Sequence, residues 1–355
     1  MRQKIFVILG FLAALTATQS VARDCTPAEK QRVLEPATAG NTTVRLRCDL
    51  TLGAGETVTK QIRILGNNSS GVRLVCRGGI IGTVGRNSLL YRKDMIQIRS
   101  IKRSGNAWSR PENVVISGCR VNGAIRLSGL GPNGQAKNVR ASSRSANHTR
   151  VAQDSAPKNI LLKNLFVVAD GRIPVYFAPG VTNSKLIDST IVGTSKSSGL
   201  YLDAETASNT IQGNVFDVRT PREILSIDGS AHNVVANNRF QASDSGGVYV
   251  YRNCGEGGAA RHQKPMFNQI KNNRFLYNGS QPPRPTIWLS YKSIGRTVLF
   301  CPQDRKIPYG SGIDDQNFAD QNIVSGNAFV NSPISAVIRN GGTENRVFSN
   351  HRVRK

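Results

Sequence analysis

Tyrosines and carboxylates alternate with apolar residues in three short segments of this chain. The first segment carries Tyr201 and Asp203, the second carries Asp228, and the third carries Tyr249 and Tyr251. Strict alternation is typical of a β-strand, in which successive side chains point to opposite faces, so these polar residues should share one outer face. Phenols and carboxylates on one face can give and take protons in sugar chemistry.

Cleavage of a uronic-acid polysaccharide by β-elimination requires groups of this kind. A cation neutralises the sugar carboxylate, a base removes the C5 proton, and an acid protonates the leaving oxygen. C5-epimerisation of such a polymer would use nearly the same groups. We predict catalytic roles for Asp203, Asp228, Tyr249, Tyr251, Arg252 and His262. We predict that the acidic polysaccharide is bound by Arg126, Tyr176, Tyr201, Arg222, Arg261 and Trp288.

Two other functions fit the same residues. A glycoside hydrolase needs two carboxylates, one of them protonated, and Asp203 and Asp228 would raise each other's proton affinity on neighbouring strands. A protein that binds polysaccharide or the cell envelope without cleaving it would use the same face. Nucleic acid is not an expected partner, because the basic residues are scattered and the sequence contains no recognisable nucleic-acid-binding module.

A calcium ion is a further expectation. Asp203, Glu205 and Asp228 offer carboxylate oxygens, the ligands that Ca²⁺ prefers, and such an ion would help to neutralise a uronate. The sequence has no Cys-x-x-Cys motif or His/Cys cluster that would indicate zinc or redox chemistry.

A repeat of about 24 residues must position these groups. Each full copy has an asparagine, a second asparagine five residues later and often a phenylalanine two residues after that. Asparagine tolerates the left-handed backbone conformation and suits the corners between short strands. We expect the asparagines to form a hydrogen-bonded ladder and the phenylalanines to stack inside. The copies are Asn159/Asn164/Phe166, Asn209/Asn214/Phe216, Asn233/Asn238/Phe240, Asn268/Asn273/Phe275, Asn322/Asn327/Phe329 and Asn345/Asn350, with degenerate copies at Asn113 and Asn183.

This N-x-I-x-x-N-x-F repeat resembles that of the right-handed parallel β-helix proteins of the pectate-lyase-like superfamily. The resemblance covers about residues 55–352 and implies an all-β solenoid in a single domain, 23–355. The superfamily includes lyases, hydrolases, epimerases, esterases and phage tailspikes, so the resemblance implies a fold and not a reaction. Polygalacturonase-like hydrolases of this superfamily have additional paired aspartates, which the predicted outer face of this chain lacks.

The ends and interruptions of the repeat can also be predicted. Thr26 and Pro27 are typical of a helix N-terminus, so a short helix should cap the solenoid within about residues 23–54. Inserted loops interrupt the coils at 129–157, 252–266 and 292–315, beside the outer face. Tyr201 lies eight residues before its asparagine, whereas Tyr176 and Ser226 lie seven before theirs, which predicts one extra corner residue after Tyr201.

The cellular location of the protein and the pairing of its cysteines can also be predicted. Basic residues precede an apolar run in residues 1–22, which is typical of a cleavable signal peptide, so we expect a secreted or periplasmic protein. The formal net charge of +25 favours an anionic partner. We expect a monomer without a membrane span. The six cysteines are expected to pair in chain order, as Cys25–Cys48, Cys76–Cys119 and Cys254–Cys301.

Overall fold

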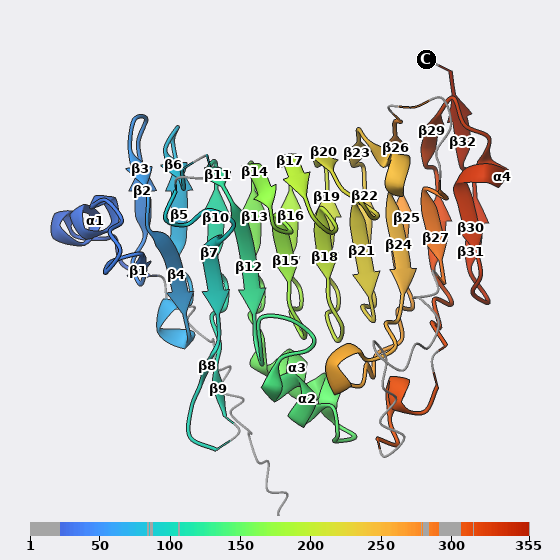
Figure 1. Ribbon diagram of the computed structural model, residues 1–355, viewed down its shortest axis with the longest axis horizontal. Helices are drawn as coiled ribbons and strands as arrows, with labels where there is room; N and C mark the ends of the chain where they lie inside the picture. The colour runs from blue at the N-terminus through green and yellow to red at the C-terminus, as the bar shows by residue number, and fades with distance from the viewer. Residues whose placement is uncertain are drawn as a thin grey trace, which may run out of the picture.

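Three long parallel sheets form the body of the protein in the computed structural model (Figure 1). The structure describes residues 22–354, except 84, 86–87, 106, 278, 280–283, 291–306 and 315. Each coil contributes one strand to each sheet, and every neighbouring pair within the three sheets is parallel. The predicted fold, a right-handed parallel β-helix with a short N-terminal helix, is confirmed.

The strands are short and follow one another coil by coil. Sheet 1 contains β1 (Thr43–Arg45), β4 (Gln61–Leu65), β7 (Asp94–Arg99), β12 (Ala124–Ser128), β15 (Val175–Phe177), β18 (Leu200–Leu202), β21 (Leu225–Asp228), β24 (Val248–Tyr251), β27 (Ile287–Leu289) and β30 (Ile338–Asn340). Sheet 2 contains β2 (Leu50–Leu52), β5 (Arg73–Cys76), β10 (Val115–Ser117), β13 (Leu161–Lys163), β16 (Lys185–Ile187), β19 (Thr210–Gln212), β22 (Val234–Ala236), β25 (Gln269–Lys271), β28 (Ile323–Ser325) and β31 (Arg346–Phe348). Sheet 3 contains β3 (Thr57–Val58), β6 (Ile80–Ile81), β11 (Arg120–Asn122), β14 (Phe166–Gly171), β17 (Thr190–Ser195), β20 (Val215–Arg219), β23 (Arg239–Phe240), β26 (Arg274–Phe275), β29 (Ala328–Val330) and β32 (His351–Val353).

Short helices cover the ends and one side of the solenoid. Helix α1 (Pro27–Leu34) is the predicted cap, and Thr26 and Glu29 form a capping box at its start. Helices α2 (Lys137–Ser142) and α3 (His148–Ser155) occupy the first insertion, at the lower end of the sheet 1 strands in Figure 1. The remaining elements are α4 (Ile334–Val337), the antiparallel pair β8 (Ile101–Lys102) and β9 (Trp108–Ser109), and 3₁₀ turns at Asn67–Ser69, Ser243–Ser245, Glu256–Gly258 and Gly310–Gly312.

The predicted asparagine ladder exists in the C-terminal coils. Asn238 accepts hydrogen bonds from the backbone and side-chain amides of Asn214, at 2.9 Å each. It donates in the same two ways to Asn273, at 3.0 Å each, and its side chain also donates to the buried carbonyl of Ile211 at 2.8 Å. A parallel ladder joins Asn209, Asn233, Asn268, Asn322 and Asn345 at the other corner.

The equivalence assumed for the N-terminal copies is wrong by one residue. Asn159, Asn164 and Asn183 have positive φ values of 57°, 52° and 52°, so they occupy the left-handed corner position. The ladder position is the following residue, and there Ser184 accepts from a neighbouring coil and donates its backbone amide to Asn209. Asparagine suits both positions, so its presence alone does not distinguish them.

The same offset decides where the phenylalanines lie. Phe216, Phe240, Phe275 and Phe329 stack in the core with ring centroids 4.7–5.2 Å apart, as predicted. Val167, and not Phe166, is in register with the inward-pointing residues Ile191 and Phe216. Because neighbouring residues of a strand point to opposite faces, Phe166 points outward and is 38% exposed. The prediction that Phe166 joins the inner stack is therefore wrong.

Two predicted disulfides are confirmed, Cys25–Cys48 and Cys76–Cys119. Cys254 is also disulfide-bonded, and its predicted partner, Cys301, lies outside the described residues. No helix in the described part of the chain is long and apolar enough to cross a membrane.

Replacement of Asn238 by alanine should destabilise the protein by about 2–4 kcal/mol, because it leaves the buried backbone amide of Asn214 without its acceptor and removes the side-chain bonds to the Ile211 carbonyl and to Asn273. Asn237→Gly is the matched control, since Asn237 is exposed and has a φ of 56° that glycine adopts without strain. It should change the free energy of unfolding by less than about 1 kcal/mol. Urea denaturation measures both, and equal losses would contradict the ladder's role.

Candidate functional site

The outer residues of sheet 1 align in one row from coil to coil. We call Arg126, Tyr176, Tyr201, Ser226, Tyr249 and Trp288 the outer row, and each is the register partner of the next. The corner after Tyr201 is one residue longer than the corner after Ser226, as predicted. The corner after Tyr201 is as long as the corner after Tyr176. Tyr176 seemed closer to its asparagine in the sequence because Asn183 lies one position before the ladder position.

The outer row is covered and does not form an open groove. Tyr176 and Tyr201 are 8% and 9% exposed, and Tyr249 and Tyr251 are 0% and 2% exposed. The rings of Tyr176 and Tyr201 stack with centroids 5.2 Å apart. The inserted segments that contain α2 and α3 and residues 252–266 contact the coils at this side, so strand alternation correctly predicted the outward direction but not the exposure.

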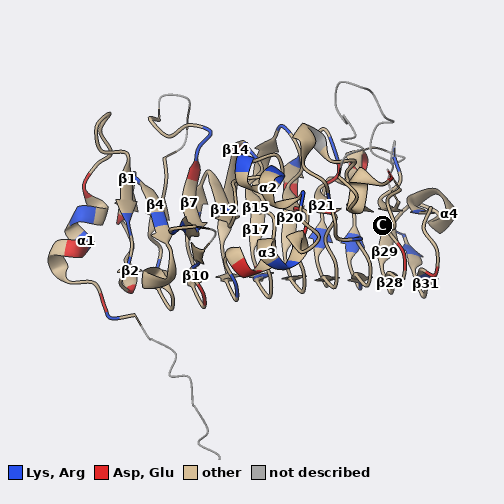
Figure 2. Ribbon diagram, turned by 90° about the horizontal axis from the view of Figure 1, so that it is seen from below, with Lys and Arg blue, Asp and Glu red and all other residues tan. Residues whose placement is uncertain are grey.

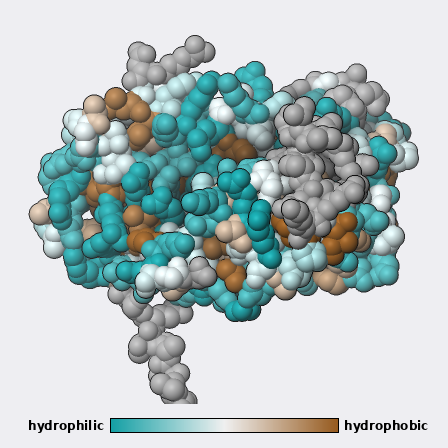
Figure 3. Space-filling view, turned by 60° about the horizontal axis from the view of Figure 1, so that its bottom comes forward, coloured by the Kyte–Doolittle hydropathy of each residue, from teal (hydrophilic) through white to brown (hydrophobic). Residues whose placement is uncertain are grey.

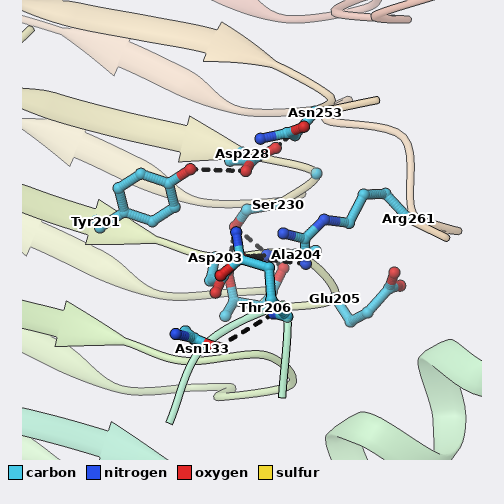
Figure 4. Close-up of polar contacts among 12 residues, drawn as sticks. Asn133, Tyr201, Asp203, Ala204, Glu205, Thr206, Asp228, Ser230, Asn253 and Arg261 are labelled. Carbon is cyan, nitrogen blue, oxygen red and sulfur yellow. Dashed lines mark hydrogen bonds and ion pairs between the residues drawn. The ribbon is translucent and has the colours of Figure 1, made fainter. Parts of the chain in front are cut away.

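Asp203 and Asp228 lie on adjacent coils and have equivalent surroundings (Figure 4). Asp203 accepts hydrogen bonds from the Tyr176 hydroxyl at 2.6 Å and from the backbone amide of Ala204 at 2.8 Å. Asp228 accepts from the Tyr201 hydroxyl at 2.7 Å and from the backbone amide of Asn253 at 2.7 Å.

Arg261 brings a cation into this carboxylate pair from the second insertion. Its Nη1 lies 3.4 Å from Asp203 Oδ1, and its side chain is 2% exposed. Gly134 of the first insertion leaves room for the guanidinium, since a Cβ there would lie 1.9 Å from Nη1. Burial is the main cause that raises the pKa of Asp228 to about 6; Arg261 opposes the rise and Asp203 adds to it.

Glu205 fastens both insertions to its coil. Its fully buried carboxylate accepts from the Thr149 hydroxyl at 2.5 Å and from the backbone amides of His262 and Gln263 at 2.8 and 3.1 Å. Burial raises the pKa of Glu205, whereas these hydrogen bonds lower it. Glu205 is in the left-handed conformation, with a φ of 64°, in the longer corner.

His262 is held inside this junction of the two insertions. Its Nε2 lies 2.7 Å from the carbonyl oxygen of Ser143, and its ring contacts that of His148 at a centroid distance of 4.9 Å. Burial lowers the pKa of His148 to about 3, and the nearby His262 and Arg261 lower it further, so His148 is neutral at physiological pH.

A second polar group surrounds Glu223, which is not among the predicted site residues. The Glu223 side chain is 1% exposed and lies 2.9 Å from Arg222 Nη2. It also accepts hydrogen bonds from the Ser226 and Tyr251 hydroxyls, the latter at 3.2 Å. Arg222 also donates to the Tyr251 hydroxyl at 2.9 Å, and its side chain is 39% exposed.

The other predicted site residues lie around these two groups. Arg252 forms an ion pair with Asp314 at 2.7 Å, and Arg126 forms one with Asp94 at 3.1 Å, so each holds two segments together. The Tyr249 hydroxyl donates to the Pro285 carbonyl at 2.9 Å. The Trp288 ring contacts the ring of Tyr249 edge-on, with Arg339 over its face.

The described residues contain no group of three or more His, Cys, Asp or Glu side chains that could hold a metal ion. Calcium binding by Asp203, Glu205 and Asp228 stays a prediction. The surface of this side of the molecule is mostly hydrophilic, with small separate hydrophobic patches (Figure 3).

Comparisons with known proteins identify the fold. No family model matches the chain, and no curated protein does. An alginate lyase from Paenibacillus sp. str. FPU-7 is similar in structure, with a TM-score of 0.52 and 15% sequence identity over 91% of this chain and 92% of that one. The chain has the parallel β-helix fold. Identity this low supports no statement about the reaction.

Two further solved structures show the same likeness. A tailspike protein mutant of E. coli bacteriophage HK620, in complex with a pentasaccharide, has a TM-score of 0.51 and 12% identity over 92% of this chain. A GH136 lacto-N-biosidase from Eubacterium ramulus has a TM-score of 0.50 and 12% identity over 90% of this chain. This chain spans 53% of each of those proteins, about half of their length.

Asp228→Asn should change how stability depends on pH. The folded-state pKa of about 6 exceeds the ordinary 3.8, so the folded protein binds the proton more tightly and wild-type stability falls as pH rises through this window. The asparagine variant lacks this loss, so its stability relative to wild type should increase by up to ~3 kcal/mol across the window. Urea unfolding on either side of the window measures the difference.

Asp217→Asn is the control for that comparison, because Asp217 is exposed on β20. If Asp228→Asn and wild type followed parallel pH curves, the raised pKa of Asp228 would be wrong.

Proposed function

We propose that the protein acts on an acidic polysaccharide by β-elimination, at the cluster of Arg222, Tyr251, Tyr201 and Asp228. The observation that carries this proposal is a chain of polar contacts. Arg222 Nη2 donates to the Tyr251 hydroxyl at 2.9 Å, the Tyr251 and Tyr201 hydroxyls lie 3.4 Å apart, and Tyr201 donates to Asp228 at 2.7 Å. A partly exposed cation is thus linked to a buried proton acceptor.

Arg222 is suited to neutralise the carboxylate of a uronate sugar. Its guanidinium is partly exposed and already lies against the Tyr251 oxygen. An arginine beside a carboxylate stabilises the negative charge that develops when the C5 proton leaves. The neutralising charge and the proton-accepting oxygen therefore lie side by side.

Tyr251 acts through a relay in this mechanism and not as a standing phenolate. Burial raises the pKa of Tyr251 well above its ordinary value, and Glu223 raises it further. The Tyr251 oxygen takes the C5 proton while its own proton moves to Tyr201, and that of Tyr201 moves to the Asp228 carboxylate. The C4–O bond then breaks as the C4–C5 double bond forms, and the relay returns one proton to the leaving oxygen.

The raised pKa of Asp228 fits the role of acceptor at the end of the relay. A base is most effective when its pKa lies near the working pH, and burial brings that of Asp228 to about 6. The net positive charge of the chain favours an acidic polymer. The disulfides support export to an oxidising compartment.

A glycoside hydrolase is the second candidate, because Asp203 and Asp228 lie on adjacent coils and only Asp228 needs to be protonated as the acid. Both carboxylates are at most 1% exposed and already accept a tyrosine hydroxyl and a backbone amide. These contacts favour an acceptor role behind the tyrosines over direct contact with a glycosidic oxygen.

Incubation with alginate, pectate or glucuronan should release unsaturated products, detected by their ultraviolet absorbance. Tyr251→Phe should lower kcat/KM at least ~100-fold, because it interrupts the proton relay. Activity of the wild type should fall as pH drops below about 6, where Asp228 becomes protonated. Tyr277→Phe is the control, since the Tyr277 hydroxyl is half-buried and contacts Thr286.

Other products would contradict elimination and identify its alternatives. New reducing ends without ultraviolet absorbance would indicate hydrolysis, and altered uronate composition without chain cleavage would indicate C5-epimerisation. Retention on the polymer with no product would indicate a binding protein.

Calcium is tested separately, with the chelator EDTA. If Asp203, Glu205 and Asp228 hold an essential Ca²⁺ ion, EDTA should abolish activity and added Ca²⁺ should restore it. Unchanged activity after dialysis against EDTA would contradict the predicted site.

A further inference from the structure

Five arginines gather on the first coils, away from the two insertions that cover the outer row. We call Arg45, Arg47, Arg63, Arg99 and Arg103 the arginine face. All are exposed except Arg63, which is half-buried. Basic segments of the ribbon are visible near β1 and β4 in Figure 2.

The arginine face belongs to the same register as the outer row. Arg45 pairs with Arg63, Arg63 pairs with Gln97, and Gln97 pairs with Arg126 on neighbouring strands of sheet 1. Adjacent positions in such a row are ~4.8 Å apart. A single extended polymer that follows the axis of the solenoid could therefore contact successive coils.

No carboxylate in the described part of the chain forms an ion pair with any of these five arginines. Arg45 donates to the Leu65 carbonyl at 3.2 Å, and Arg63 donates to the side-chain oxygen of Gln61 at 2.7 Å. Both partners are neutral. Arg126, the next cation along the row, is by contrast paired with Asp94. The arginine face thus carries an uncompensated positive charge.

The arginines also act on one another. Burial lowers the pKa of Arg45, and the nearby charges of Arg47 and Arg103 lower it further. Burial and the charge of Arg63 likewise lower the pKa of Arg99. Like charges that crowd in this way repel, and a bound anion would relieve the repulsion.

A cavity of about 470 Å³ adjoins this face, between α1 and the first coil. Arg45 and Arg47 line it together with Arg32, and its two carboxylates, Glu29 and Glu35, are already paired with Arg23 and Lys60. An anionic group that enters this cavity would meet unpaired guanidinium groups.

We propose that the arginine face binds successive carboxylates of an acidic polysaccharide chain. The class of polymer rests on the proposed function, whereas the binding site rests on the arginines alone. Guanidinium groups bind carboxylates with two parallel hydrogen bonds, and a polyuronate presents one carboxylate on every sugar. Single-stranded nucleic acid fits less well, because the row Arg45–Arg63–Gln97 offers no aromatic ring on which bases could stack.

The test compares two double variants that remove the same charge. Arg45→Ser/Arg99→Ser removes two cations of the arginine face. Arg239→Ser/Arg274→Ser removes two exposed arginines that are register partners on sheet 3. Binding of alginate and polygalacturonate is measured by calorimetry in the Tyr251→Phe background, so that the polymer stays intact. The first variant should weaken Kd about 3- to 30-fold and reduce its salt dependence, and the control should leave Kd within about twofold.

Each outcome of this test decides the proposal separately from the proposed reaction. Selective weakening in the first variant supports the site even if no unsaturated product is ever detected. Equal weakening in both variants would mean that only bulk charge attracts the polymer, and no binding of polyuronate would overturn the proposal outright. If single-stranded DNA lost more affinity than polyuronate in the first variant, the ligand class would be wrong. Circular dichroism and thermal melting check that both variants are folded.

Discussion

In the C-terminal coils, from Asn209 onward, each coil is fixed on the next one at two corners by asparagines that bond to the backbone and side chain of a neighbouring coil. At Asn238 these bonds link three consecutive coils and satisfy the Ile211 carbonyl inside the corner. Because side chains alternate along each strand, a fixed corner determines which residue of every following strand points outward. The C-terminal part of the outer row and the buried phenylalanine stack are both consequences of this register.

The insertions turn part of a regular scaffold into a buried polar region. Burial of a charged side chain is costly unless it is paired and hydrogen-bonded. Asp203 and Asp228 meet this requirement through tyrosine hydroxyls, backbone amides and the nearby Arg261. Glu205 meets it with donors from both insertions, so one carboxylate binds each insertion to the coil.

The architecture could be predicted from the sequence because equivalent positions of the repeat occupy equivalent places in successive coils. Asn209, Asn214 and Phe216 occupy the ladder and the core as expected. Phe166 does not lie in the core. Asparagine suits both the left-handed corner position and the ladder position, so an alignment of the repeats by residue type alone can be wrong by one residue.

The site was less predictable because it depends on what the insertions cover. Outward direction follows from strand alternation, but exposure depends on the path of segments that do not repeat. Glu223 was not predicted, because its neighbour in the chain, Arg222, is partly exposed, yet the Glu223 side chain is buried and accepts a hydrogen bond from Tyr251. Arg261 is far from Asp203 in sequence and approaches it only because the insertion folds back. Alternation alone could identify that Asp203 and Asp228 share one outward register, but it could not show that they are buried.

Burial also explains how charge is divided along the solenoid. Helices α2 and α3 lie over coils that follow β12, and the cations beneath or beside them are paired with carboxylates, as in Arg126 with Asp94 and Arg261 with Asp203. Arg45 and Arg99 lie before this cover and are exposed to water, which allows them to remain charged without a carboxylate partner. One register therefore carries neutralised cations where it is covered and free cations where it is open. The open coils would therefore attract a polyanion more strongly than the covered coils, where the cations are already neutralised.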